Sequence, residues 1–263
     1  SPALRCLAAR DSLGAEWSVG EFMYRSAIVA LMVLIGGCAG GFGAPSVEAS
    51  KAISQAKTVG VISAVGHKFA LQKMGITVFG NELNEVAAGS WGIDDAIASK
   101  VSALLSGRYA VRRISPPAGL DADNAEDMVR KIAASQKHDL YVVVARSTAP
   151  FGSSNQVVTG LGMIEAGGVI NPDNITLFAV TTVLVYDGRT FERLGWQRTG
   201  VEGISIGKTI NAPTRSLDHT WWPATPQAVH NDKLKAATRA LAVEGLSTTI
   251  PQIMGLTKQA KAG

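Results

Sequence analysis

The stretch Leu140-Tyr-Val-Val-Val-Ala145 decides the fold. Its side chains are apolar or aromatic without interruption, whereas a strand with one face in water alternates apolar and polar residues. The stretch therefore predicts a strand that is buried on both faces, as in α/β proteins whose sheet carries helices on both sides.

Strand and helix patterns alternate ahead of this stretch. Lys57–Val65 is rich in β-branched residues and predicts a strand, and Phe69–Phe79 predicts a second extended segment. A helix is expected over Ile93–Ser106, because apolar residues recur along one face of it. These residues are Ile93, Ile97, Val101, Leu104 and Leu105. A short strand at Tyr109–Ile114 and a helix from a cap at Asp123 to about Lys137 complete this part, with Met128, Ile132 and Ala133 facing inward.

A β-hairpin is the strongest signal in the second half of the chain. Ile175–Tyr186 and Phe191–Thr199 flank Asp187-Gly188, a favoured turn pair. The Gly-, Ser- and Asn-rich residues 146–174 predict a long connection, residues 203–230 predict irregular structure, and Asn231–Met254 predicts a final helix. The whole predicts an α/β fold with a single mixed β-sheet flanked by about three helices, and a C-terminal β-hairpin and helix.

Composition limits the classes of function. The chain has 263 residues, of which 46% are hydrophobic and 17% charged, as expected for a globular protein and not for a disordered or polytopic membrane protein. The net charge is +4, no run of five Lys or Arg occurs, and only 6% of residues are aromatic. These values argue against a nucleic-acid partner.

The amino-terminal part has the pattern of a secretory signal. Arg25 precedes the apolar run Ala27–Ile35, and Gly36-Gly37 follows it. The run is shorter than the ~20 residues that a membrane-spanning helix needs. A short buried core helix is the alternative. We therefore expect Met23 to be the true initiator, so that residues 1–37 consist of an over-extended start followed by a signal peptide. The other interpretation is that the residues ahead of Met23 are a genuine, long n-region of the signal.

Leu34-Ile-Gly-Gly-Cys38 resembles the bacterial lipobox, in which branched aliphatic residues and a small residue precede a cysteine. Ile35 stands where leucine is usual. The resemblance implies that a diacylglycerol is attached to the thiol of Cys38 and that the signal is cut between Gly37 and Cys38. One acyl chain binds a membrane only marginally, with a constant of about 10⁴ M⁻¹, whereas two or three hold a protein almost permanently.

The resemblance also implies a location. Cys38 is followed by Ala39 and not by aspartate, which favours the outer membrane, with the domain facing the periplasm. The cysteines of the chain are Cys6 and Cys38, so the mature domain has no internal thiol to mispair in an oxidising compartment. Residues 38–56 are expected to form a lipidated flexible tether, and residues 57–263 a single α/β domain.

Three segments of the expected domain resemble the curli-secretion lipoprotein and TolB amino-terminal families. The helix Ile93–Ser106 with the strand after it is similar to a helix–strand unit of these families, His138–Val144 to their buried strand, and Val185–Trp196 to their hairpin. Phe191 stands where these families often have glycine. The resemblance implies an accessory protein of an envelope assembly and not an enzyme, and it assigns no functional residue.

Phosphate- and nucleotide-binding motifs fail on spacing. Gly203-Ile-Ser-Ile-Gly-Lys-Thr209 has three residues between its glycines where a P-loop has four. Gly160-Leu-Gly-Met-Ile-Glu165 lacks the third glycine of a dinucleotide loop and is interpreted as a flexible loop. Asp94 and Asp95 diverge by about 100° on a helix and are interpreted as helix-start residues. No cofactor is expected.

The histidines give one candidate catalytic arrangement. His67, His138, His219 and His230 have no metal-ligand spacing, so no metal site is expected. His219 could pair with Asp218 or Asp232, and Ser153, Ser154 or Ser216 could complete a hydrolase triad. No serine lies in a Gly-x-Ser-x-Gly elbow, so no catalytic residue is assigned.

Trp221-Trp222 is the most unusual local feature, because adjacent side chains of an extended segment point to opposite sides. One ring is a candidate interface anchor; the alternative is that the loop buries both. The leading hypothesis is a non-enzymatic accessory or assembly lipoprotein with a protein partner or a second copy of itself. The alternatives are a periplasmic hydrolase using His219, and a small-ligand binding module using residues 146–174.

Overall fold

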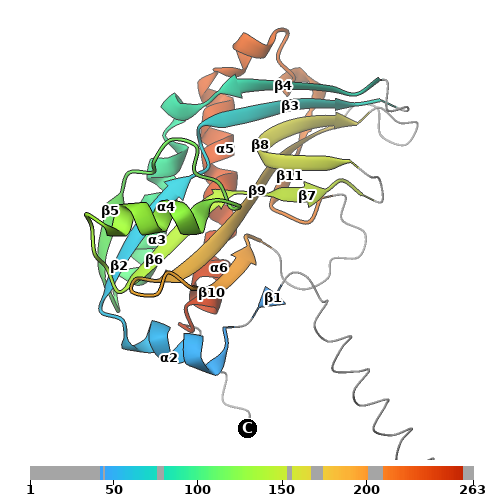
Figure 1. Ribbon diagram of the computed structural model, residues 1–263. Coiled ribbons are helices and arrows are strands. Elements are labelled where there is room, and N and C mark those ends of the chain that lie inside the picture. Colours follow the sequence, from blue (N-terminus) through green and yellow to red (C-terminus); the bar gives the residue numbers. More distant parts are fainter. Residues whose placement is uncertain are drawn as a thin grey trace, which may run out of the picture. The chain divides into compact units, whose positions relative to one another are not determined.

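One mixed sheet organises the structure (Figure 1). The computed structural model describes residues 42–43, 45–75, 80–152, 156–166, 174–200 and 210–256. The central path of the sheet runs β4 (Glu82–Ala87), β3 (Lys68–Met74), β8 (Val157–Ala166), β9 (Asn174–Asp187), β6 (Leu140–Arg146), β2 (Thr58–Ala64) and β5 (Ala110–Ile114). The fold class predicted from the sequence is confirmed.

The long strand β9 joins the two halves of the sheet. Its first half pairs with β8 and its second half with β6, both antiparallel. On its other edge it pairs with β11 (Thr214–Asp218) and then with β10 (Arg193–Arg198). Short strands β1 (Phe42–Gly43) and β7 (Thr148–Pro150) pair with β10 and β8. In the other half, β2 lies parallel to both β5 and β6.

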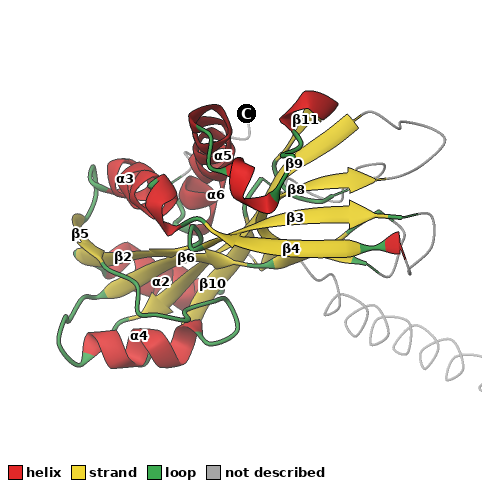
Figure 2. Cartoon of the chain, turned by 90° about the horizontal axis from the view of Figure 1, so that it is seen from above, coloured by secondary structure: helices red, strands yellow, loops and turns green. Residues whose placement is uncertain are grey.

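Helices cover both faces of the sheet, as the Leu140–Ala145 stretch requires (Figure 2). Helices α3 (Ile93–Leu105), α5 (Asp232–Glu244) and α6 (Leu246–Ile253) pack over one face and α4 (Ala125–Ala133) over the other. Every residue of β6 is buried, because successive side chains enter the two cores in turn. Three short 3₁₀ helices complete the described elements: η3 (Gly89–Trp91), η4 (His219–Trp221) and η5 (Pro226–Val229).

The helix and hairpin predictions are largely confirmed. In α3 the residues Ile93, Ile97, Val101 and Leu105 are buried, and Leu104 is half-buried. The hairpin β9–β10 turns at Asp187–Thr190. Phe191 follows the turn with a φ of 62°, in the left-handed region that favours glycine.

Helix α4 and the final helix differ in detail from the prediction. α4 begins after Asn124 rather than Asp123 and ends at Ala133. It buries Ala125, Val129 and Ala133, and Met128 and Ile132, which were expected to face inward, are half-buried against the same core. The final helix is divided into α5 and α6 at Gly245, where an added Cβ would lie 2.5 Å from the backbone nitrogen of Gly200. A side chain at this position would collide with the backbone of Gly200, so the close approach of the two segments requires glycine.

Two segments expected to be irregular contain regular structure. Residues 146–174 form β7 and β8, and Thr214–Asp218 forms β11, whose side chains are exposed apart from Leu217 and so give no apolar alternation. For Glu82–Ala87, which forms β4, the sequence pattern predicts no element, and this strand is also mostly exposed. β4 and β11 are mostly exposed, and their polar composition gives no strand signal, whereas β8 lies between β3 and β9 and contains two glycines.

The expected tether is in part a helix. Val47–Gln55 forms α2, which is capped by Ser46 and buries Ala49 and Ile53, the latter against the main core. The compact unit therefore begins near Phe42 rather than at residue 57. Met23, Gly37 and Cys38 lie outside the described residues.

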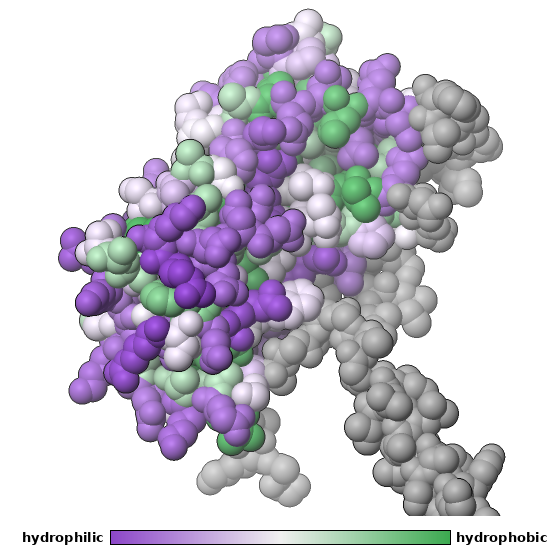
Figure 3. All heavy atoms as spheres, in the orientation of Figure 1, coloured by the Kyte–Doolittle hydropathy of each residue, from purple (hydrophilic) through white to green (hydrophobic). Residues whose placement is uncertain are grey.

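The visible surface is mostly polar. Figure 3 shows hydrophilic residues over most of this face, with apolar residues in small separate groups. Among the described helices, none combines the length and the apolar character that crossing a membrane requires.

Candidate functional site

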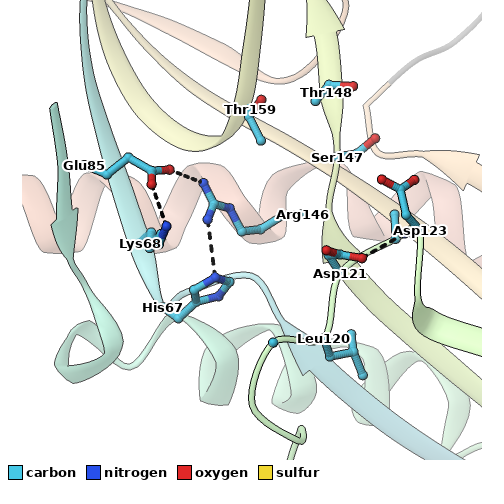
Figure 4. Close-up of a pocket in the computed structure, with 12 residues that line it drawn as sticks. His67, Lys68, Glu85, Leu120, Asp121, Asp123, Arg146, Ser147, Thr148 and Thr159 are labelled. Atoms are coloured by element: carbon cyan, nitrogen blue, oxygen red, sulfur yellow. Dashed lines mark hydrogen bonds and ion pairs between the residues drawn. The ribbon is translucent and has the colours of Figure 1, made fainter. Parts of the chain in front are cut away.

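A polar cavity lies at the carboxyl ends of the parallel strands β2, β5 and β6 (Figure 4). Its volume is about 530 Å³. Each strand delivers a short segment to it: His67 and Lys68 follow β2, residues 119–123 follow β5, and Arg146 ends β6. In open α/β sheets, ligands bind in the crevice outside the carboxyl ends of the strands. We call this space, with its lining residues, the β-end pocket.

Arg146 is the central charged group of the β-end pocket. Its side chain is only 9% exposed, although it follows an apolar strand. Its Nη2 donates to Oε1 of Glu85 at 3.0 Å, and its Nη1 lies 3.3 Å from Nε2 of His67. Lys68 Nζ lies 2.6 Å from Oε2 of the same glutamate. One carboxylate on β4 thus pairs with two cations.

A glycine makes the place for Arg146. Gly160 on β8 has a φ of +66°, and a Cβ added there would lie 2.4 Å from Arg146 Nε. The guanidinium therefore lies directly against the backbone of β8. Arg146 Nε is buried and has no hydrogen-bond partner among the described residues. Gly160 makes room for this contact, and both glycines of 160–165 are part of β8, so the flexible-loop interpretation is wrong.

Asp94, at the start of α3, fixes the segment that carries His67. Its carboxylate accepts from Ser63 Oγ at 2.6 Å, from the backbone N–H of Val65 at 2.8 Å and from that of Gly66 at 3.1 Å. Asp95 points away and is exposed. The two aspartates do start the helix as predicted, but only Asp94 also anchors the chain after β2.

The opposite wall of the β-end pocket is acidic. Asp121 Oδ1 accepts from the backbone N–H groups of Asp123 and Asn124, each at 3.0 Å, which stabilises the turn after β5. Figure 4 shows the carboxylates of Asp121 and Asp123 on one side and the Arg146–Glu85–Lys68 group on the other, with hydroxyls of Ser147, Thr148 and Thr159 around the space.

The surroundings lower the pKa values of two ionisable groups of the pocket, His67 and Glu85. Partial burial, and then the nearby charge of Arg146, lower the pKa of His67 below its ordinary value of 6.5. The hydrogen bond from Lys68 is the main cause that lowers the pKa of Glu85. A neutral His67 beside a charged Glu85 is the state in which both can accept hydrogen bonds from Arg146.

Acidification is expected to destabilise the domain as the pH falls through about 6.5. The pKa values of His67 and His138 are both lowered, in each case first by burial, so the unfolded chain binds more protons than the folded one in this range. Stability is therefore full above pH 6.5 and declines below it. Urea midpoints at pH 7.5, 6.5 and 5.5 measure this, and the double variant His67→Gln/His138→Gln should flatten the decline. An equal decline in that variant would contradict the assignment.

The candidate hydrolase pair forms with a different partner. His219 Nε2 lies 2.8 Å from Oε1 of Glu165, whereas Asp218 accepts from Thr220 and Asp232 lies beside Lys235. In the described part of the chain no serine hydroxyl is hydrogen-bonded to His219. Ser153, Ser154 and the segment 203–209 lie outside the described residues.

The remaining candidates are structural or half-exposed. Trp221 and Trp222 are both half-buried against the main core, and Lys233 Nζ and Lys73 Nζ lie 4.0 and 5.6 Å from their ring centroids. Neither the fully exposed nor the fully buried alternative describes them, and their role as an interface stays a prediction. His230 Nδ1 accepts from the indole N–H of the buried Trp91 at 3.0 Å. No cluster of three His, Cys, Asp or Glu among the described residues could hold a metal ion.

The comparisons with known proteins give distant similarities of structure. No protein-family model and no curated protein matches the chain. Similar solved structures include a Xanthomonas campestris protein of the DUF330 family model, with a TM-score of 0.36, 11% identity, and coverage of 77% of this chain and 89% of that one. A PelC dodecamer from Paraburkholderia phytofirmans has a TM-score of 0.28 and 12% identity, with coverage of 74% of this chain and 88% of that one. Lipoprotein GNA1162 from Neisseria meningitidis has a TM-score of 0.25 and 10% identity, with coverage of 73% of this chain and 98% of that one. These values support no conclusion about the function of this chain.

Proposed function

We propose that the chain is a lipid-anchored envelope protein whose α/β domain is a non-enzymatic accessory or assembly factor. The observation that carries the proposal is the apolar run Ala27–Ile35 followed by Gly36-Gly37-Cys38. An apolar run of this length is typical of an export signal and is too short for a spanning helix, and the resemblance to the lipobox implies lipid attachment at the cysteine. In this proposal the domain faces the periplasm from the outer membrane.

The geometry of the domain supports the non-enzymatic part. The β-end pocket contains charges, but in its described lining no hydroxyl is hydrogen-bonded to His67 or to a carboxylate, so no nucleophile is paired with a base there. The His219–Glu165 pair lies on the surface, with the His219 side chain 58% exposed, where no water-excluding wall supports catalysis.

Replacing Cys38 with serine is expected to remove the lipid and release the protein from the membrane fraction. The thiol is the acceptor of the diacylglycerol in the proposal, and a serine hydroxyl does not replace it. Incorporation of labelled palmitate, together with carbonate-washed membrane fractions, measures both effects.

Cys6→Ser is the matched control, because it removes the other cysteine of the chain. We expect it to keep both the label and the membrane location. Label retained by the Cys38→Ser protein would overturn the lipid attachment, and an unlabelled protein that stays in the membrane would show an uncleaved anchor in its place.

The accessory role is tested by its partners. Cross-linking in intact cells followed by purification in detergent should return a specific envelope protein or a defined oligomer of the chain. A protein that remains monomeric and returns no specific partner in repeated experiments would contradict this part of the proposal.

A further inference from the structure

We propose that the β-end pocket binds a small zwitterion, such as a free amino acid or a short peptide, with its carboxylate on the Arg146 side and its ammonium group on the Asp121–Asp123 side. The inference goes beyond the lipid anchor and the accessory role, and it rests on the charges, burial and position of the pocket.

The basic side keeps an unbalanced positive charge. Arg146 and Lys68 share the single carboxylate of Glu85, so this group carries a net charge of +1. The guanidinium has five N–H groups, and its contacts with Glu85 and His67 use two. Its Nε faces the backbone of Gly160, so the donors left for a ligand are the second N–H groups of Nη1 and Nη2, and the side chain is more than nine-tenths buried while it lines the cavity. A buried guanidinium with free donors is the group that best binds a carboxylate.

The acidic side keeps an unbalanced negative charge. Asp121 uses Oδ1 for two backbone N–H groups of its own turn, and Asp123 is exposed. Within the described residues, neither carboxylate forms an ion pair with a lysine, an arginine or a histidine. Two carboxylates that face the same cavity without a cation leave a place for an ammonium group.

The two sides together favour a zwitterion over a simple anion or cation. An anion would meet a pocket whose formal charges sum to −1, and a cation would leave the buried guanidinium without its partner. A molecule with both charges satisfies both walls. The volume of about 530 Å³ suits a small ligand, and the hydroxyls of Ser147, Thr148 and Thr159 can bind its uncharged polar groups.

Isothermal titration of the full-length protein in detergent tests the proposal with three probes of nearly equal size. Glycylglycine has both charges, N-acetylglycylglycine lacks the ammonium group, and glycylglycine amide lacks the carboxylate. We expect glycylglycine to bind about tenfold or more tightly than either blocked form, because each block removes one charged hydrogen-bonding group. Equal binding of the three, binding of one blocked form only, or no binding of glycylglycine overturns the proposal.

Variants assign the ends of the ligand. Asp123→Asn should weaken glycylglycine about tenfold and leave N-acetylglycylglycine unchanged, whereas Asp127→Asn on the exposed face of α4 is the control and should change neither. Arg146→Lys keeps the charge but loses the planar, bidentate N–H donors of the guanidinium, so it should weaken the binding of the peptides that have a free carboxylate. Equal effects of Asp123→Asn and Asp127→Asn would contradict the assignment. Binding is measured on purified protein, so a failure to bind would not contradict the proposed lipid anchor. A failure of palmitate labelling would likewise not contradict the proposed ligand site.

Discussion

Replacing Gly160 with alanine is expected to destabilise the domain by about 3 kcal/mol. Two costs add at this position. The backbone has a φ of +66°, which costs an alanine about 1 kcal/mol. The new Cβ would also stand 2.4 Å from Arg146 Nε, so the buried guanidinium must leave its contacts with Glu85 and His67. A buried charge that loses its partners accounts for the rest of the loss.

Gly119→Ala is the matched control. Gly119 lies in the wall of the same pocket with a φ of +78°, but nothing lies within 4 Å of an added Cβ. It should therefore lose only the backbone part, about 1 kcal/mol. Urea unfolding of both variants measures the difference. Equal losses would mean that Arg146 moves aside without loss of stability and that its contact with the backbone of β8 at Gly160 does not stabilise the domain.

Replacing Asp94 with alanine is the second large expected effect, also a loss of about 3 kcal/mol in the free energy of unfolding. The carboxylate accepts from Ser63 Oγ and from the backbone N–H groups of Val65 and Gly66. Both backbone groups belong to buried residues, so without Asp94 they would be desolvated and unpaired. The segment that carries His67 into the pocket would lose its anchor.

Asp95→Ala controls for the position at the helix start. Asp95 occupies the next position of the same first turn and is exposed, so it shares the favourable interaction with the helix dipole and lacks the buried acceptor role. Its loss should be about 0.5 kcal/mol. If thermal or urea unfolding gave equal losses of stability for the two variants, the charge at the helix start alone would explain the contribution of Asp94.

The central layer of the fold is predictable from sequence for a physical reason. β6 is buried on both faces, so every one of its residues is apolar until Arg146, and the hairpin β9–β10 has turn residues that few other structures favour. Helix α3 has a regular apolar face because it packs on the sheet along its whole length. In each case a single local pattern of residues is enough to predict the element and its burial.

The glycine-rich β8 is not predictable in the same way. Gly160 and Gly162 look like loop residues, yet their missing side chains make room for Arg146 and for Phe178 and Ala70. The reason for each glycine is a neighbour distant in the chain, and a local pattern does not contain it. The same applies to α2 within the expected tether, whose burial depends on the core it meets.

The β-end pocket was missed because its parts come from four separate segments. His67, Glu85, Asp121 and Arg146 share no motif and meet only when the parallel strands β2, β5 and β6 form one sheet with β3 and β4. One signal was available: Arg146 ends an otherwise apolar strand, where a charge needs a buried partner or a function. The sequence hypothesis that residues 146–174 serve a ligand site included part of the lining, namely Arg146, Ser147, Thr148 and Thr159.

The most direct test of the central claim, that the chain is an exported lipoprotein, is the intact mass of the protein extracted from membranes. The account predicts a polypeptide that begins at Cys38 and carries the added mass of two or three acyl chains on that residue. A polypeptide that still contains residues ahead of Cys38, or one that begins at Cys38 without acyl chains, would contradict it.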